Sequence, residues 1–435
     1  MLTSMSELIT GKPKWTVLMH GLFNSQKGGK LSEMKWILIG SFVISKIYHG
    51  FLDYLNASYM EKELPENVKD VYDYDTYQKW MRYTKECRRT ALMESAISSI
   101  LVLIFLACNV YSGIFNIFEG SSTYLSYFLT LAFFTLITLP VSIPFSYHNT
   151  FVIEEKYGMN KTTKKTFFLD VLKETLIGIA LSYGVLVLVM VLFERFGNTG
   201  ILWITAAIIL ISLILSLLIM PIMRIFNKFT PLEDSELKSE LLNLCGKYRV
   251  KIKRIVVMDA SRRTTKANAF CTGLTRKKTI SLDDNLVENY SIEQIVAVFA
   301  HEFAHARYKH VLRSLPFGIL RTVIVILTLG LILNSEAVFS AFGFSGINYF
   351  FAFQALPLVN WWLEELLDII SNKISRQHEY QADAFAAKEG YGNALIDALK
   401  KLHRDALSDL NPHPLIVILE YSHPTLSQRI KAISE

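Results

Sequence analysis

Long apolar runs dominate the pattern of hydrophobic and polar positions along this 435-residue chain. Each run is close to or above the ~20 residues with which an α-helix crosses the hydrocarbon core of a bilayer. One run alone also fits a buried core helix, but several in one chain indicate a polytopic membrane protein. We therefore predict seven transmembrane helices, over Trp36–Leu52, Ala91–Phe115, Tyr124–Ser146, Phe167–Phe193, Ile201–Met223, Leu315–Asn334 and Ile347–Ile370.

Charged residues interrupt the last of these runs at Glu364, Glu365 and Asp368. An ionisable group in hydrocarbon is costly unless it faces a polar interior. Two interpretations follow. Either the last helix lines a water-filled cavity, or it has already left the membrane at these residues.

The apolar runs divide the chain into four parts. Residues 1–223 form an N-terminal membrane region with five of the predicted helices, and residues 315–370 contain the other two. The more polar segments 224–314 and 371–435 are predicted to form a soluble domain in two pieces. The predicted fold class is therefore a mainly α-helical polytopic membrane protein with an additional soluble domain.

Within segment 224–314 the pattern predicts a small β-sheet and two helices. Ile255–Asp259 and Lys278–Leu282 have the composition of short strands, and Asn268–Gly273 between them is predicted to be extended. Pro231–Leu237 resembles a helix start, with a proline and acidic residues in the first turn. Ser291–His310 is predicted to be one amphipathic helix.

Composition and charge agree with a membrane protein and suggest its orientation. Hydrophobic residues make up 51% of the chain and charged residues 19%. The loops 53–90, 147–166 and 224–314 carry most of the loop lysines and arginines, so the positive-inside rule places them and the C-terminus in the cytosol. Lysines in the N-terminal segment oppose this orientation. The net charge of +6 is compatible with anionic lipid, and no basic patch indicates nucleic-acid binding.

The strongest chemical signal is the H-E-x-x-H motif at His301–His305. On a helix, positions i and i+4 share a face, so His301 and His305 can bind one metal ion. Glu302 then lies beside the open coordination position, where it can act as general base toward bound water. This is the apparatus of a zinc metallopeptidase. The four cysteines show no spacing typical of a metal site or a disulfide framework.

Catalytic zinc needs a third protein ligand, and Glu379 is the candidate. Asp383 is four residues later on the same helix face, where it can accept a hydrogen bond from the ring N–H of a ligand histidine. His378 lies about 100° round the same helix from Glu379, so it is a poor ligand candidate. His310 and His403 are interpreted as ordinary surface residues.

These motifs resemble the type I CAAX prenyl proteases, integral-membrane zinc endopeptidases that process prenylated proteins. The resemblance covers most of the chain. One departure is Phe303-Ala304, where the family usually has Ile-Gly; we expect it to affect packing more than chemistry. The segments that carry the resemblance are 151–161, 226–234, 268–273, 301–305, 375–383 and 421–425.

The resemblance implies an architecture and further roles for individual residues. It implies about seven transmembrane helices enclosing a water-filled chamber, capped by a gluzincin-like zinc protease domain with one Zn²⁺ per chain. His301, His305 and Glu379 match the zinc ligands, and Glu302 the catalytic base. Asn268 and Ala269 match an edge strand that pairs with the substrate backbone. His423 and Arg429 match a pair near the zinc, with His423 in catalysis and Arg429 in substrate binding.

By the same resemblance, the substrates are CAAX proteins whose C-terminal cysteine carries a farnesyl or geranylgeranyl chain. The three residues after that cysteine are removed, by attack of zinc-bound water with Glu302 as general base. Membrane lipid surrounds the enzyme, which is expected to be a monomer. The expected location is the endoplasmic reticulum, with the nuclear envelope as a second site.

Two alternatives share parts of this evidence. A quality-control membrane metalloprotease of the heat-shock type would use the same site on misfolded or translocon-clogging proteins. A seven-helix transporter or receptor with a structural metal would not need Glu302, because this residue is not a ligand. Substitution of Glu302 separates the second alternative from either protease.

Overall fold

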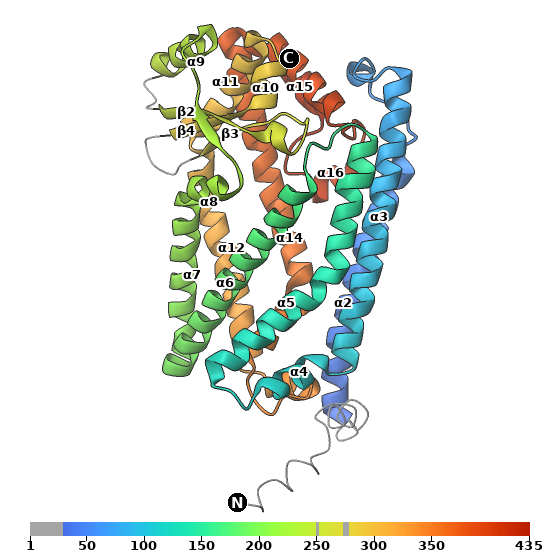
Figure 1. Ribbon diagram of the computed structural model, residues 1–435, viewed down its shortest axis with the longest axis vertical. Helices are drawn as coiled ribbons and strands as arrows, with labels where there is room; N and C mark the ends of the chain where they lie inside the picture. The colour runs from blue at the N-terminus through green and yellow to red at the C-terminus, as the bar shows by residue number, and fades with distance from the viewer. Residues whose placement is uncertain (1–28, 249–251, 273–277) are drawn as a thin grey trace, which may run out of the picture.

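The computed structural model describes residues 29–248, 252–272 and 278–435. The chain is mostly helical, and long helices run side by side from one end of the molecule to the other (Figure 1). The helices are α2 Gly29–Tyr59, α3 Tyr74–Ala107, α4 Val110–Phe118, α5 Thr123–His148, α6 Lys164–Phe196, α7 Gly200–Leu217, α8 Ile219–Phe226, α9 Glu236–Lys247, α10 Asp284–Asn289, α11 Ile292–Tyr308, α12 His310–Leu333, α13 Glu336–Ala341, α14 Tyr349–Ala386, α15 Gly392–Asp405, α16 Pro414–Leu419 and α17 Leu426–Ser434.

All seven predicted apolar segments are helical, but two of them are divided into two helices by a turn. The second run is broken after Ala107, because Asn109 adopts a left-handed conformation (φ 56°) and α4 starts a new direction. The fifth is broken at Leu218, where α7 gives way to α8. High mean hydropathy over a run therefore did not reveal where the backbone turns, since one turn falls on the polar Asn109 and the other on the apolar Leu218.

Four stretches of the described residues are long and apolar enough to cross a membrane. One of these stretches combines α6 and α7. The helices α2 and α14 are not among the four stretches, so seven crossings stay a prediction. Large apolar side chains on these helices face outward, for example Leu202 and Leu331, each 73% exposed. In water this exposure would be unfavourable, and in lipid it is not. The stretches are Tyr74–Ala107, Thr123–Glu154, Lys164–Leu217 and His310–Leu333.

The charges in the last apolar run are paired with neighbouring helices. α14 continues without a break through Glu364, Glu365 and Asp368. Arg321 of α12 forms ion pairs with Glu364 and Asp368, and His49 of α2 lies 3.6 Å from Glu365. Cross-helix pairing reduces the cost of these charges and connects α14 to both neighbours.

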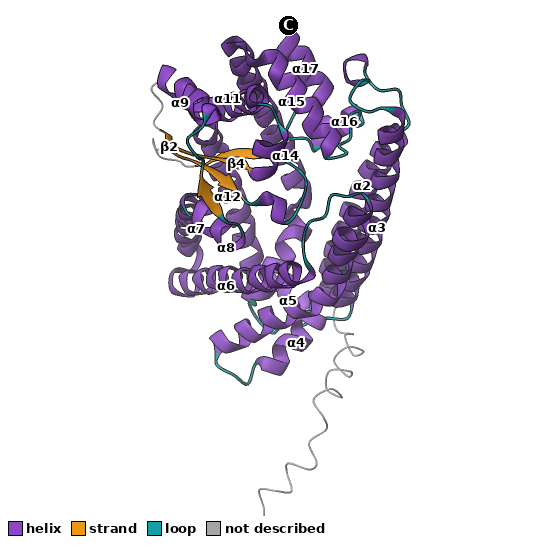
Figure 2. Ribbon diagram, turned by 45° about the horizontal axis from the view of Figure 1, so that its top comes forward, coloured by secondary structure: helices purple, strands orange, loops and turns teal. Residues whose placement is uncertain are grey.

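The segment between α8 and α10 contains a four-stranded mixed sheet in the order β1-β2-β4-β3. It lies between α9 and α11 on one side and the end of the helical bundle on the other (Figure 2). The central pair β2–β4 is parallel and the outer pairs are antiparallel. Because β3 is last in the order and pairs with β4 alone among the described strands, it is an edge strand. The strands are β1 Phe229–Pro231, β2 Ile252–Met258, β3 Ala269–Thr272 and β4 Lys278–Asp283.

The three predicted extended segments correspond to β2, β3 and β4. A helix does begin within the predicted segment Pro231–Leu237, but Pro231 is not in its first turn. Pro231 ends β1, and α9 begins at Glu236 after its N-cap Ser235, whose hydroxyl accepts from the Lys238 N–H. Pro231 can close an edge strand because that position needs no N–H donor. The Ser235 cap satisfies a free helix N–H, which proline would not do.

Buried side chains form two cores. One lies among the membrane helices, and the other surrounds α11 and extends through the sheet, α15 and α17. The second core also includes Met60 and Val68 from the connection between α2 and α3, and Trp80 from α3. The N-terminal part of the chain therefore contributes directly to the packing around the H-E-x-x-H helix.

Candidate metal centre

The helix that carries the motif has well-defined ends. α11 starts with a capping box in which Ser291 and Gln294 satisfy each other's backbone N–H groups. It ends one residue before a left-handed Lys309 (φ 58°), so His310 belongs to the next helix. The face opposite the site is fully buried apolar surface, with Phe299, Phe303 and Ala304 at 0% exposure. This packing holds the histidine face in a fixed orientation.

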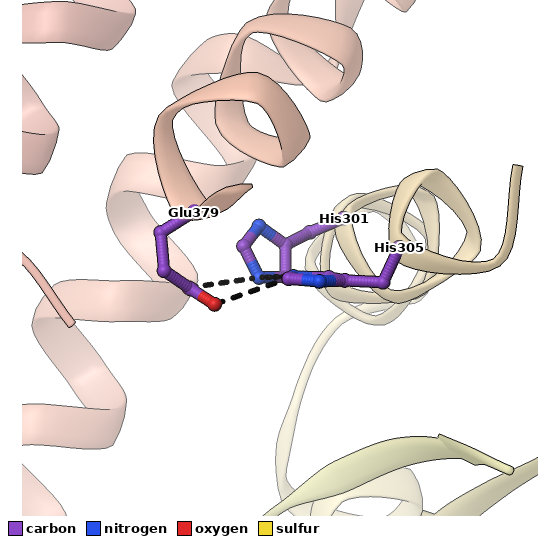
Figure 3. Close-up of side chains that lie close together, drawn as sticks. All are labelled: His301, His305 and Glu379. Carbon is purple, nitrogen blue, oxygen red and sulfur yellow. Dashed lines mark hydrogen bonds and ion pairs between the residues drawn. The ribbon is translucent and has the colours of Figure 1, made fainter. Parts of the chain in front are cut away.

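His301, His305 and Glu379 meet in one place (Figure 3). The facing Nε2 atoms of the two histidines are 3.2 Å apart. The Glu379 Oε2 lies 3.3 Å from His301 Nε2, and its Oε1 lies 3.4 Å from His305 Nε2. Ligand atoms that are about 2.0–2.1 Å from one tetrahedral metal ion lie about 3.4 Å from each other. The three side chains therefore have the separations of ligands that share a single ion.

One buried carboxylate oxygen supports the assignment of a metal ion to this position. Among the described residues, Oε2 of Glu379 is buried and accepts no hydrogen bond. The side chain of Glu379 is only 5% exposed, and a buried carboxylate oxygen without a donor is costly. A cation between the carboxylate and the imidazoles removes this cost. Two nitrogen donors and one oxygen donor suit a transition metal such as zinc.

Asp383 lies where the spacing predicts it. Its Oδ1 accepts from His301 Nδ1 at 2.9 Å, which leaves Nε2 of His301 facing the centre. Arg429 donates to Asp383 through Nε at 2.8 Å and through Nη2 at 2.6 Å. Burial alone would raise the pKa of Asp383, but the hydrogen bonds from Arg429 and His301 outweigh it and lower this pKa to about 2. The carboxylate is thus ionised at neutral pH and orients the ligand ring.

Burial also lowers the pKa of His301, but the hydrogen bond with Asp383 and the ion pair with Glu379 outweigh it and raise this pKa to about 9. Burial, together with the charge of His301, lowers the pKa of His305 to about 3. The pair therefore carries one positive charge when no metal is bound. An imidazole must be neutral to bind a metal, so metal binding is expected to release a proton.

The interpretation of His310 as a surface residue is wrong. Its ring is buried (3% exposed), and its Nδ1 lies 3.0 Å from Nδ1 of His305. On the other side its Nε2 lies 3.1 Å from Oε1 of Gln381, and the ring stacks on His378 at 4.1 Å. His403 is also partly buried, with Nδ1 bonded to the Leu399 carbonyl. His310 follows His305 by only five residues, so the sequence already placed the two histidines close together. Their contact depends on the turn at Lys309, which folds His310 back onto His305.

A pocket of about 150 Å³ opens beside these ligands. Glu302 and His423 line it, and so do Asn268 and Ala269 at the start of the edge strand β3. His423 comes from the loop before α17, and its Nε2 lies 3.5 Å from Oε1 of Glu379. The pocket thus brings together residues from four distant parts of the chain. Arg429 also lines it, although its guanidinium donates to Asp383 and lies against the His301 ring.

The unusual pair in the motif lies on the side of α11 away from the pocket. Phe303 packs against Phe299, Tyr248 and Phe385, and Ala304 is fully buried. Neither side chain reaches the metal centre. This agrees with the expectation that the departure affects packing more than chemistry.

The membrane helices, the histidine–glutamate cluster and the pocket define the class of protein as an integral-membrane metalloendopeptidase. Comparisons with known proteins agree. Residues 54–228 match the family model of the CAAX prenyl protease N-terminal region, which has five membrane helices, and residues 231–435 match peptidase family M48.

Individual relatives match over nearly the whole chain. CAAX prenyl protease 1 of Saccharomyces cerevisiae is 30% identical over 429 residues, covering 91% of this chain and 94% of the relative. The probable CAAX prenyl protease 1 of Schizosaccharomyces pombe is 31% identical, covering 91% and 88%. The crystal structure of S. mikatae Ste24p has a TM-score of 0.86 at 28% identity, covering 92% of this chain and 99% of that one. The chain belongs to the CAAX prenyl protease 1 family of M48 peptidases.

Proposed function

We propose that this protein is a zinc endopeptidase that removes the three C-terminal residues of farnesylated or geranylgeranylated CAAX proteins. The observation that carries the proposal is the cluster of His301, His305 and Glu379 beside Glu302, in a pocket bordered by an edge strand. Relatives that match almost the whole chain are named CAAX prenyl proteases, which supports this substrate class.

His301, His305 and Glu379 would hold the ion, with Asp383 and His310 orienting the two imidazoles. Bound zinc lowers the pKa of water and polarises the scissile carbonyl. Each histidine receives its orientation from a different neighbour, since Asp383 contacts Nδ1 of His301 and His310 contacts Nδ1 of His305. Such contacts fix the tautomer that presents Nε2 to the metal.

Glu302 acts as the general base. It takes a proton from the attacking water and later delivers it to the leaving amine. His423, whose Nε2 is on the same side of the pocket as Glu379, stabilises the oxyanion that develops on the carbonyl. These two residues lie on different elements, so their spacing depends on the tertiary fold.

The substrate backbone pairs with β3. This strand is at the edge of the sheet and pairs with β4 on one side, with Ala269 opposite Leu282. An extended peptide can add to the other side by β-augmentation. Asn268 and Ala269 would then guide the residues next to the scissile bond into the pocket.

The lipid on the substrate explains why the site belongs to a membrane protein. An isoprenoid chain partitions into the bilayer, so a membrane enzyme meets its substrate in two dimensions. The positive-inside rule favours a cytosolic protease domain and C-terminus, and we place the protein in the endoplasmic reticulum as a monomer. The structure agrees in one respect: the α2–α3 and α5–α6 connections both contact the protease domain.

Cleavage of a farnesylated CAAX peptide by the purified protein tests the proposal. Mass spectrometry should detect loss of three residues with the wild type and with Glu293→Gln, an exposed glutamate at the start of the same helix. Glu302→Gln should retain zinc and lose turnover. Cleavage of unprenylated chains alone would favour the quality-control alternative, and an active Glu302→Gln variant would refute the mechanism.

A further inference from the structure

The short helix α16 packs against two long helices, α2 and α14. At its start, the backbone N–H of His413 donates to Oδ1 of Asn56 on α2 at 3.0 Å, and the ring of His413 packs on Tyr59. At its end, α16 contacts α14 through Asn372 and Arg376. The next loop carries His423, so α16 is the last fixed element before this residue.

Arg376 binds the C-terminal end of α16. Its Nη1 donates to the carbonyls of Val417 at 2.9 Å and Tyr421 at 2.5 Å, and its Nη2 to that of Ile418 at 3.4 Å. Asn372 donates to the Leu419 carbonyl at 2.8 Å. The last carbonyls of a helix have no partner within the helix, and a cation there is favourable. One guanidinium therefore closes α16 and also fixes the backbone of Tyr421, two residues after the helix ends.

His423 depends on this loop for its position. Its side chain is 62% exposed, and its ring lies beside Glu379 on one side and the hydroxyl of its neighbour Ser422 on the other. Packing does little to hold such a side chain, so the backbone must place it. On the C-terminal side the loop is fixed by α17, which starts with a capping box of Thr425 and Gln428. On the N-terminal side it is fixed by Arg376.

Arg376 is also one helical turn from Glu379 on α14, so it faces the same side of the helix as the proposed ligand. A rigid stretch of helix thus links the ligand carboxylate to the backbone before His423. We propose that Arg376 is a positioning residue that sets His423 at its working distance from the metal centre. This inference rests on the proposed function, because it assigns a catalytic role to His423.

The test compares Arg376→Gln, His423→Ala and the double variant by kcat and KM on a farnesylated peptide. A misplaced catalytic group can cost about 10²-fold, so we expect Arg376→Gln to lower kcat by about 10- to 100-fold with little change in KM. In the His423→Ala background, Arg376→Gln should have no further effect, because the group that it positions is already absent.

Three measurements separate this role from general damage. Zinc affinity by competition with a chromophoric chelator should stay within about threefold of wild type, because the ligands are untouched. Lys373→Gln, one turn earlier and exposed, should behave like wild type. Arg376→Lys keeps a charge and should restore part of the turnover, and it replaces Arg376→Gln if that variant does not fold.

Additive losses in the double variant, or an unchanged kcat for Arg376→Gln while His423→Ala is impaired, would overturn the positioning role. Full activity of His423→Ala would instead remove His423 from the proposed mechanism. Failure of the inference is thus distinguishable from failure of the proposed function.

Discussion

Replacement of Arg429 by glutamine separates two roles for this residue. The family resemblance predicts a role in substrate binding, whereas the structure places the guanidinium on Asp383, with N–O distances of 2.6 and 2.8 Å. The side chains of Arg429 and Asp383 are 9% and 1% exposed. Arg429→Gln would therefore leave a buried carboxylate without its main counter-charge.

The magnitude follows from that burial. Removing one partner of a buried ion pair costs about 3–5 kcal/mol, because the remaining charge stays desolvated. For a folding unit of about 200 residues, each kcal/mol lowers the melting temperature by about 2–4 °C, so we expect a decrease of about 6–20 °C. Zinc affinity should fall as well, because Asp383 orients the ring of His301.

Thermal unfolding of the detergent-solubilised protein, followed by intrinsic fluorescence, measures the effect. The matched control is the double variant Arg429→Gln with Asp383→Asn, which removes both charges. It should be less destabilised than Arg429→Gln alone, because no unpaired charge remains buried. An unchanged melting temperature together with a raised KM would refute this reasoning and favour direct contact of Arg429 with substrate.

The remaining predictions concern the metal centre. Glu302→Gln should abolish peptide cleavage while zinc content stays at one ion per chain by mass spectrometry; loss of zinc would instead make Glu302 a ligand. His310→Ala should weaken zinc binding about 10- to 100-fold in chelator competition, because His305 loses the group that orients it; an unchanged affinity would show that the contact is dispensable. The folded-state pKa of Asp383, about 2, is below its ordinary value of 3.8, so its contribution to stability is complete above about pH 4 and lost as pH falls toward 2. Acid unfolding should show this loss, about 2 kcal/mol, in the wild type and not in Asp383→Asn. Zinc uptake near neutral pH should release a proton from His301, which calorimetry in buffers of different ionisation enthalpy can detect; a buffer-independent heat would contradict it.

Local spacing was sufficient for much of the candidate site. His301 and His305 share a helix face by periodicity alone, and the interval from Glu379 to Asp383 placed both carboxylates on one face of another helix. The structure brings these faces together as the motifs indicated. Hydropathy likewise located all seven helical segments, because bilayer thickness imposes a length that is visible in the sequence.

Other features depended on where the chain turns and what then meets. The breaks at Asn109 and Leu218 occur inside runs of high mean hydropathy, so the hydropathy of a whole run did not locate them. His310 became part of the site only because a left-handed residue folds α12 back toward α11. Arg376 gave no distinct signal, since its partners are backbone carbonyls 41 to 45 residues away.

The sequence by itself determined the membrane class and predicted the candidate metal ligands and general base, because these depend on composition and on spacing within single helices. The tertiary structure alone decided which residues hold the ligands in place and how His423 reaches them. These depend on contacts between elements far apart in the chain, and the free energy of such contacts comes from burial and geometry that exist only once the chain has folded.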